Sequence, residues 1–225
     1  LLVSKTYGVA PDATLLTYRT SLADDGDESG NECTFRNGNP IEDPTSLINR
    51  AISDGAQIIS ISSSDENFDD ATKWAIARAD ALGVIVVSPM GNDAKDETNN
   101  GYSKWSGVVG VGAIDTTGKV ADYSSWGQGT TTAAVGGPII VRNYETGNKA
   151  AADGTSYSTP LIAGFLALAK QKWPNATSNQ LLQLLTKTAL NNEGQWNKYP
   201  GYGVADLGAM MNTDPSQNPD EKPLM

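Results

Sequence analysis

The chain has 225 residues, of which 39% are hydrophobic and 19% are charged, a composition typical of one ordinary globular domain. Its net charge of -10, from 16 basic and 26 acidic residues, argues against nucleic-acid binding, which needs a clustered surplus of lysine and arginine. The single cysteine, Cys33, excludes a disulfide within the chain and leaves the compartment open. No apolar run is long enough to span a membrane, and the first residues lack the layout of a signal peptide.

The first half of the chain alternates short apolar runs with amphipathic stretches, a pattern typical of strand and helix repeats around a parallel sheet. A strand is predicted over residues 14–20, followed by an acidic, exposed loop over residues 21–41. Asp43 followed by Pro44 predicts the start of a helix, which Gly55 ends. The pattern therefore indicates an α/β fold.

The same alternation continues along the chain. A strand is predicted over residues 57–62, and a helix over residues 68–82 with Trp74 on its apolar face. Gly83 is placed to adopt the left-handed conformation that ends a helix. Residues 84–88 are almost entirely apolar, as expected for a parallel strand that is buried on both faces.

The second half is predicted to add three strands and two helices. The strands are expected over residues 108–114, 120–123 and 139–141. A helix rich in small residues is predicted over residues 156–172, and an amphipathic helix over residues 179–189. Residues 212–225 contain three prolines and no apolar period, which predicts a linker and limits the domain to residues 1–211.

Ser156 lies in the segment GTSYSTP, at the predicted start of the helix of small residues. The N–H groups of a first helical turn have no acceptor within the helix, and the positive end of the helix dipole favours an oxyanion nearby. A serine at this position is either a helix cap or a nucleophile. The local pattern alone does not decide between the two.

The choice between a helix cap and a nucleophile is made by a resemblance, which five segments carry in their order along the chain. They are residues 8–13 (GVAPDA), 58–64 (IISISSS), 88–93 (SPMGND), 154–160 (GTSYSTP) and 201–206 (GYGVAD). In sequence and order they resemble the subtilisin-like serine peptidases, the subtilase family, over most of the chain. The resemblance implies a three-layer α/β fold with a mostly parallel central sheet. It also implies peptide-bond hydrolysis through an acyl-enzyme on Ser156.

The same resemblance implies the other site residues. Asn92 corresponds to the family's oxyanion-hole asparagine, acting beside the backbone N–H of Ser156. Substrate contacts are assigned to two segments, Ile61, Ser62, Ser63 and Ser64 on one side and Ser88, Pro89, Met90 and Gly91 on the other. Relatives carry glycine or small residues at the positions of Ser64, Pro89 and Met90. We therefore expect a pocket that prefers small or medium side chains.

The chain contains no histidine, and Ser156 needs a base within hydrogen-bond reach that takes its proton near neutral pH. In the family, the aspartate and histidine segments precede the GVAP motif. The sequence therefore predicts a missing upstream segment that carries both residues, and a chain that is inactive alone. The alternative is a noncatalytic, peptide-binding pseudoprotease. A hydrolase using Asp69 and Asp70 is disfavoured, because neighbouring residues on a helix point in different directions.

No cofactor is expected. The acidic loop containing Asp25, Asp27, Ser29 and Gly30 begins like a calcium loop, but Arg36 stands where the bidentate glutamate belongs. A solvated surface loop is the simpler interpretation, and calcium is the alternative. The resemblance to secreted and surface-anchored relatives favours an extracytoplasmic location, with a polypeptide as the substrate.

Overall fold

A parallel sheet forms the centre of the computed structural model, which describes residues 1–18, 35–36, 39–40, 42–63, 69–142, 147–190 and 195–220. The strands follow the order β3-β4-β5-β6. They are β3 (Ile58–Ser60), β4 (Ile85–Pro89), β5 (Val108–Ile114) and β6 (Thr130–Val135). Each neighbouring pair is parallel, which confirms the predicted type of sheet.

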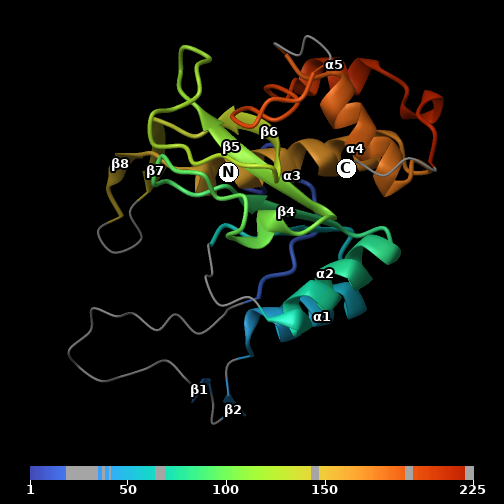
Figure 1. Ribbon diagram of the computed structural model, residues 1–225. Helices are drawn as coiled ribbons and strands as arrows, with labels where there is room; N and C mark the ends of the chain where they lie inside the picture. The colour runs from blue at the N-terminus through green and yellow to red at the C-terminus, as the bar shows by residue number, and fades with distance from the viewer. Residues whose placement is uncertain are drawn as a thin grey trace.

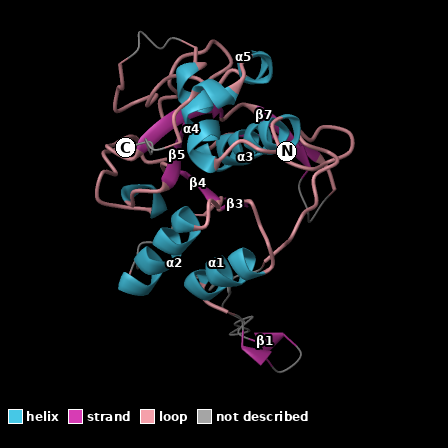
Figure 2. Ribbon diagram, turned by 90° about the vertical axis from the view of Figure 1, so that its right-hand side faces the viewer, coloured by secondary structure: helices cyan, strands magenta, loops and turns pink. Residues whose placement is uncertain are grey.

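Helices cover both faces of this sheet (Figures 1 and 2). The helices are α1 (Pro44–Ser53), α2 (Asp70–Ala81), α3 (Thr155–Lys172), α4 (Ser178–Lys187) and α5 (Leu207–Asn212). One hydrophobic cluster joins Ile59 and Ile61 to α1 and α2, whereas the other joins Ile58 to α3, α4 and α5. Successive residues of β3 therefore face opposite helix layers, and the fold is the expected three-layer α/β arrangement.

The other elements are short. They comprise β1 (Phe35–Arg36) paired antiparallel with β2 (Asn39–Pro40), β7 (Ile139–Arg142) paired antiparallel with β8 (Lys149–Ala152), and the 3-10 turns Tyr102–Lys104 and Pro215–Gln217. No helix in the described ranges is both long enough and apolar enough to cross a membrane.

Two aspartates start the helices of one layer. Asp43 caps α1 by accepting a hydrogen bond from the Ser46 N–H at 3.0 Å, with Pro44 in the first turn as predicted. The hydrogen bonds from Ser46 lower the pKa of Asp43. Asp69 caps α2 in the same way, accepting from the Thr72 N–H at 2.9 Å. Asp69 therefore has a structural role in the helix.

Three expectations about single segments of the domain differ from the structure. Residues 14–18 have no regular secondary structure, because no neighbouring strand pairs with them, and residues 19–20 lie outside the described ranges. Trp74 is 70% exposed, because α2 buries a different face, made of Thr72, Ala75, Ile76 and Ala79. Residues 120–123 form a single bridge between Ile114 and Val120 instead of a strand.

The predicted linker is partly packed against the domain. Gln180 Nε2 donates a hydrogen bond to the Asn218 carbonyl at 3.1 Å. Lys187 Nζ donates to Asn218 Oδ1 at 2.7 Å, and Asn218 is only 8% exposed. Residues 213–220 therefore contact α4, and the described part of the predicted linker belongs to the packed structure.

Replacing Leu166 with alanine should reduce the free energy of unfolding by about 2–5 kcal/mol, because it leaves a cavity in the core. Leu166 is 0% exposed and lies where α3 packs on the sheet. Leu82 is 61% exposed, so Leu82→Ala should change stability by no more than about 0.5 kcal/mol. Urea unfolding of both variants measures the difference. Equal effects would contradict the described core.

Candidate active site

Three segments that are distant in sequence meet at one edge of the sheet. β3 and β4 are parallel, so both strands end at the same edge of the sheet. Residues 62–63 follow β3 at this edge, and Gly91 and Asn92 follow β4. Thr155, the first residue of α3, contacts Asn92 there. The carboxyl edge of a parallel sheet is where ligands bind in open α/β folds. The topology therefore places the candidate residues where a site is expected.

Asn92 is oriented by two hydrogen bonds from Thr155. Its Oδ1 accepts from the Thr155 N–H at 2.8 Å and from Thr155 Oγ1 at 3.0 Å. Thr155 is 0% exposed, so these bonds lie away from solvent. Since the amide oxygen accepts both bonds, the amide nitrogen Nδ2 is left to donate at the surface. This is the orientation that an oxyanion donor needs.

Ser156 and Asn92 converge beside Gly154. A Cβ on Gly154 would lie 3.1 Å from Ser156 Oγ and 3.4 Å from Asn92 Nδ2. Gly154 also has a φ of 153°, a conformation that residues with a side chain rarely adopt. Glycine therefore keeps open the space into which the serine hydroxyl and the asparagine amide both point.

The first turn of α3 is anchored on its buried side. Ser158 Oγ donates to the Ala134 carbonyl of β6 at 3.0 Å, and Thr159 Oγ1 donates to the Thr155 carbonyl at 2.9 Å. Both side chains are fully buried, whereas Ser156 is half-buried. The helix end thus presents Ser156 to solvent, close to N–H groups that lack acceptors within the helix.

A loop around Ser125 supports the turn that carries Asn92. The Ser125 N–H donates to the Gly91 carbonyl at 3.0 Å, and Ser125 Oγ accepts from the Asp93 N–H at 3.1 Å. Tyr123 contacts the segment that carries Ser156, because its hydroxyl accepts a hydrogen bond from the Gly154 N–H at 3.2 Å. Burial raises the pKa of Tyr123, so this hydroxyl stays neutral near neutral pH.

Charges close to this turn are paired. Lys95 Nζ lies 3.2 Å from Glu97 Oε1 and 3.3 Å from Asp93 Oδ2. The hydrogen bond with Glu97, and then that with Asp93, raises the pKa of Lys95. The Glu97 residue is 8% exposed, so the ion pair neutralises a largely buried carboxylate beside the Asn92 turn.

The sequence motifs did not identify Thr155, Tyr123 or Ser125 as residues of the site. Thr155 stands directly before Ser156, so its position in the GTS segment was the available signal. Tyr123 and Ser125 lie in or next to a stretch predicted as a strand. Nothing local in the sequence indicates that they would reach the loops after β4 and before α3.

The predicted substrate-contacting residues divide into buried and exposed groups. Ser88, Pro89 and Met90 are buried, and Gly91 is half-buried. The Met90 sulfur lies 2.8 Å from the position of a Cβ on Gly110, so its side chain packs against β5. The preference for small or medium side chains stays a prediction. On the other segment, Ser62 and Ser63 are exposed, and Ile61 is half-buried. Ser64 lies outside the described residues.

The chain contains no histidine that could act as the general base. Within the described ranges, no hydrogen bond engages Ser156 Oγ. The same ranges hold no cluster of histidine, cysteine, aspartate or glutamate able to bind a metal ion. The loop considered for calcium, including Asp25, Asp27, Ser29 and Gly30, lies outside the described residues.

The family follows from sequence comparison. The model of the subtilase family, Peptidase_S8, matches residues 3–203, and the chain belongs to this family of serine proteases. It is 31% identical over 183 residues to the thermostable alkaline protease of Halalkalibacterium halodurans, covering 81% of this chain and 46% of that protein. It is 30% identical over 185 residues to subtilisin E of Bacillus subtilis, covering 81% of this chain and 45% of that protein.

Solved structures agree with this assignment. The crystal structure of fervidolysin from Fervidobacterium pennivorans, a keratinolytic enzyme related to subtilisin, matches with a TM-score of 0.66 and 27% identity. That match covers 76% of this chain and 28% of fervidolysin. The chain spans about half the length of the curated relatives it matches, from 46% to 58% for the first two.

Replacing Thr155 with valine should lower the free energy of unfolding by about 1–3 kcal/mol, because valine fills the same space but leaves buried polar groups unpaired. Thr155 Oγ1 contacts Asn92 Oδ1 at 3.0 Å and accepts from the Gly91 N–H at 3.2 Å. Thr155→Ser keeps the hydroxyl and should retain most of the stability. Chemical denaturation compares the two variants. An equal loss in both would show that the hydroxyl does not hold the Asn92 turn.

Proposed function

We propose that this chain is the nucleophile-bearing part of a serine endopeptidase that hydrolyses peptide bonds through an acyl-enzyme on Ser156. The observation that carries the proposal is the convergence of Ser156 Oγ and Asn92 Nδ2 beside Gly154, at the N-terminus of α3. Membership of the subtilase family supports the same reaction. The histidine and aspartate of the triad would come from a segment outside these 225 residues.

In the proposed reaction, Ser156 Oγ attacks the carbonyl carbon of the scissile bond while its proton passes to the histidine. The resulting oxyanion accepts hydrogen bonds from Asn92 Nδ2 and the Ser156 backbone N–H. The bond from carbon to nitrogen then breaks, and the histidine returns the proton to the leaving amine. The histidine then takes a proton from a water molecule, which attacks the carbonyl carbon of the remaining ester. The ester bond breaks, the proton returns to Ser156 Oγ, and the carboxylic acid is released.

The substrate is proposed to be a polypeptide that lies extended along residues 61–63. Ser62 and Ser63 are exposed at the carboxyl edge of β3, beside the turn that carries Asn92. An extended chain there could form backbone hydrogen bonds, as in other peptide-binding grooves. The location is proposed to be extracytoplasmic, on the resemblance to secreted and surface-anchored members of the family.

A peptide-binding pseudoprotease is the second candidate. The lack of any histidine favours it, because a peptide groove does not need a base. The arrangement around Ser156 favours the enzyme, since an aligned serine, asparagine amide and helix terminus serve catalysis and are not required for binding alone.

Labelling of Ser156 by a fluorophosphonate probe separates these candidates. The 225-residue chain alone should react slowly, because nothing takes the hydroxyl proton. The same chain produced together with the polypeptide encoded ahead of Leu1 should label rapidly, and Ser156→Ala should abolish the label. A completed protein that folds but never labels would favour the pseudoprotease.

In the active form, Asn92→Ala should lower kcat by about 100-fold to 1,000-fold with little change in KM, because the donor acts mainly in the transition state. Asn92→Asp retains the oxygen that accepts from Thr155 but removes the donor, so it should lower kcat similarly. Asn99→Ala, at an exposed position in the same loop, should leave both constants unchanged. Steady-state hydrolysis of a peptide substrate measures all three. A normal kcat in Asn92→Ala would remove Asn92 from the mechanism.

A further inference from the structure

One short segment contacts both turns of the candidate site. Residues 123–126 belong to the connection between β5 and β6. On one side they bond to the turn that carries Asn92. On the other side, Tyr123 bonds to Gly154, two residues before Ser156. The segment therefore connects the two parts of the site, which lie on the loops after β4 and before α3.

The pairing with the Asn92 turn is a short parallel ladder. Four backbone hydrogen bonds join residues 91–97 to residues 123–126, with donors from both segments. They run from the Ser125 N–H to the Gly91 carbonyl at 3.0 Å, from Ala94 to Tyr123 at 3.0 Å, from Trp126 to Lys95 at 3.1 Å and from Glu97 to Trp126 at 2.7 Å. Asp96 and Trp126 form a parallel bridge within this ladder. The turn is therefore held along its length.

Ser125 bonds to the backbone on both sides of Asn92. Its N–H donates to the Gly91 carbonyl, and its Oγ accepts from the Asp93 N–H at 3.1 Å. These two groups belong to the peptide units that flank Asn92. Ser125 is 0% exposed, so water does not compete for the bonds. Ser125 thus fixes the backbone from which the Asn92 amide is directed.

The Tyr123 hydroxyl occupies a space that Gly136 leaves open beside the Ser156 turn. A Cβ on Gly136 would lie 2.7 Å from the hydroxyl oxygen of Tyr123 and 2.9 Å from Ser158 Oγ. The Gly154 N–H donates to this hydroxyl at 3.2 Å and to the Gly136 carbonyl at 2.9 Å. The hydroxyl therefore lies between the end of β6 and the first turn of α3.

We propose that Tyr123 and Ser125 are positioning residues, which together set the distance between Ser156 Oγ and Asn92 Nδ2. This role rests on the proposed function, since Ser125 acts through the oxyanion donor and Tyr123 acts through the turn that presents the nucleophile. An oxyanion donor must lie about 2.7–3.1 Å from the developing charge. An error of about 1 Å in such a position can cost about 100-fold in rate, so the spacing of the two turns decides the rate.

Ser124 provides a matched control for Ser125. Both serines are buried, at 2% and 0% exposed, and both side chains accept a backbone hydrogen bond. Ser124 Oγ, however, accepts from the Ala113 N–H of β5 at 3.0 Å and not from the Asn92 turn. Replacing either serine with alanine removes one buried hydroxyl, but only Ser125→Ala frees the turn.

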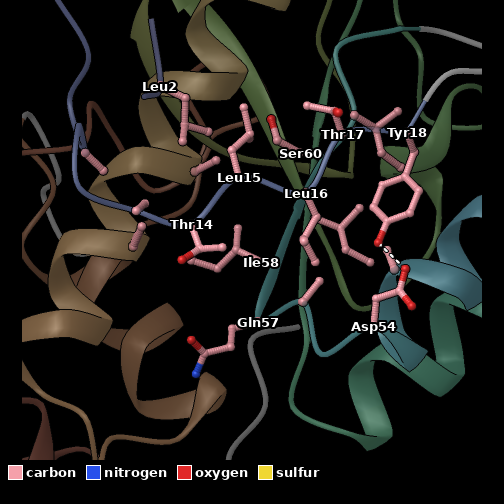
Figure 3. A pocket seen from close by; sticks show the side chains of 18 of the residues that line it. Leu2, Thr14, Leu15, Leu16, Thr17, Tyr18, Asp54, Gln57, Ile58 and Ser60 are labelled. Atoms are coloured by element: carbon pink, nitrogen blue, oxygen red, sulfur yellow. Dashed lines mark hydrogen bonds between the residues drawn. The ribbon is translucent and has the colours of Figure 1, made fainter. Parts of the chain in front are cut away.

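Tyr18 provides the matched control for Tyr123. It lines a cavity beside β3, and the described lining of that cavity includes neither Ser156 nor residues 123–126. Its hydroxyl donates to Asp54 Oδ2 at 2.7 Å (Figure 3). Tyr18→Phe therefore removes a bonded hydroxyl outside the contacts of the site.

In the active form of the enzyme, Ser125→Ala should lower kcat by at least about tenfold and leave KM within about twofold, because the oxyanion donor acts mainly in the transition state. Ser124→Ala should keep both constants within about twofold. Tyr123→Phe should lower kcat by about threefold to tenfold, whereas Tyr18→Phe should leave it unchanged. Steady-state hydrolysis of a peptide substrate measures all four variants at a temperature where each is folded.

A double substitution separates positioning from general destabilisation. If Ser125 acts through Asn92, then Ser125→Ala should cause no further loss of kcat in an enzyme that already carries Asn92→Ala. Tyr123→Phe acts through the Ser156 turn, so it should keep its full effect in the same background. A loss from Ser125→Ala that is equal in both backgrounds would overturn its role as a positioning residue.

Hydrogen exchange tests the same contacts without any catalysis. In the 225-residue chain, Ser125→Ala should speed exchange of the Asp93 amide by at least about fivefold, because that N–H loses its acceptor. Tyr123→Phe should speed exchange of the Gly154 amide and leave the Asp93 amide unchanged. Ser124→Ala should affect neither amide.

The two readouts keep this proposal separate from the peptidase proposal. Peptide hydrolysis with equal kcat in Ser124→Ala and Ser125→Ala would retain the peptidase and overturn the positioning role. An unaltered enzyme that never hydrolyses peptides would reject the peptidase, and amide exchange would then decide by itself whether residues 123–126 hold the two turns. Unchanged exchange at both Asp93 and Gly154 would overturn that contact as well.

Discussion

The parallel order of the central sheet is the constraint on which the rest of the structure depends. A strand such as β5, buried at every residue, is stable only where helices cover both faces of the sheet. Parallel neighbours also need crossover connections, which here pass through α2 and the segments that flank the sheet. As a consequence, the strands leave the sheet at one common edge, and this edge carries the candidate site.

At that edge, the candidate site depends on a few short hydrogen bonds between loops. Thr155 holds the oxygen of Asn92, and Ser125 holds the turn on both sides of Asn92. These bonds connect the end of β4, the loop before β6 and the start of α3. Each of these segments adjoins an element of the packed core. The positions of the polar groups in the site are therefore set by the packing of the core.

The sequence alone determined the local features and the family, because these depend on neighbouring residues. The cap at Asp43, the positive φ of Gly83 and the buried strand near residues 84–88 were all confirmed. Ser156 and Asn92 were named by resemblance, and their catalytic roles remain predictions. Only the tertiary structure decided the exposure of Trp74, the inward packing of Met90 and the unpaired state of residues 14–18. Periodicity shows that a segment has an apolar face, but burial and pairing depend on whether another element packs against that face.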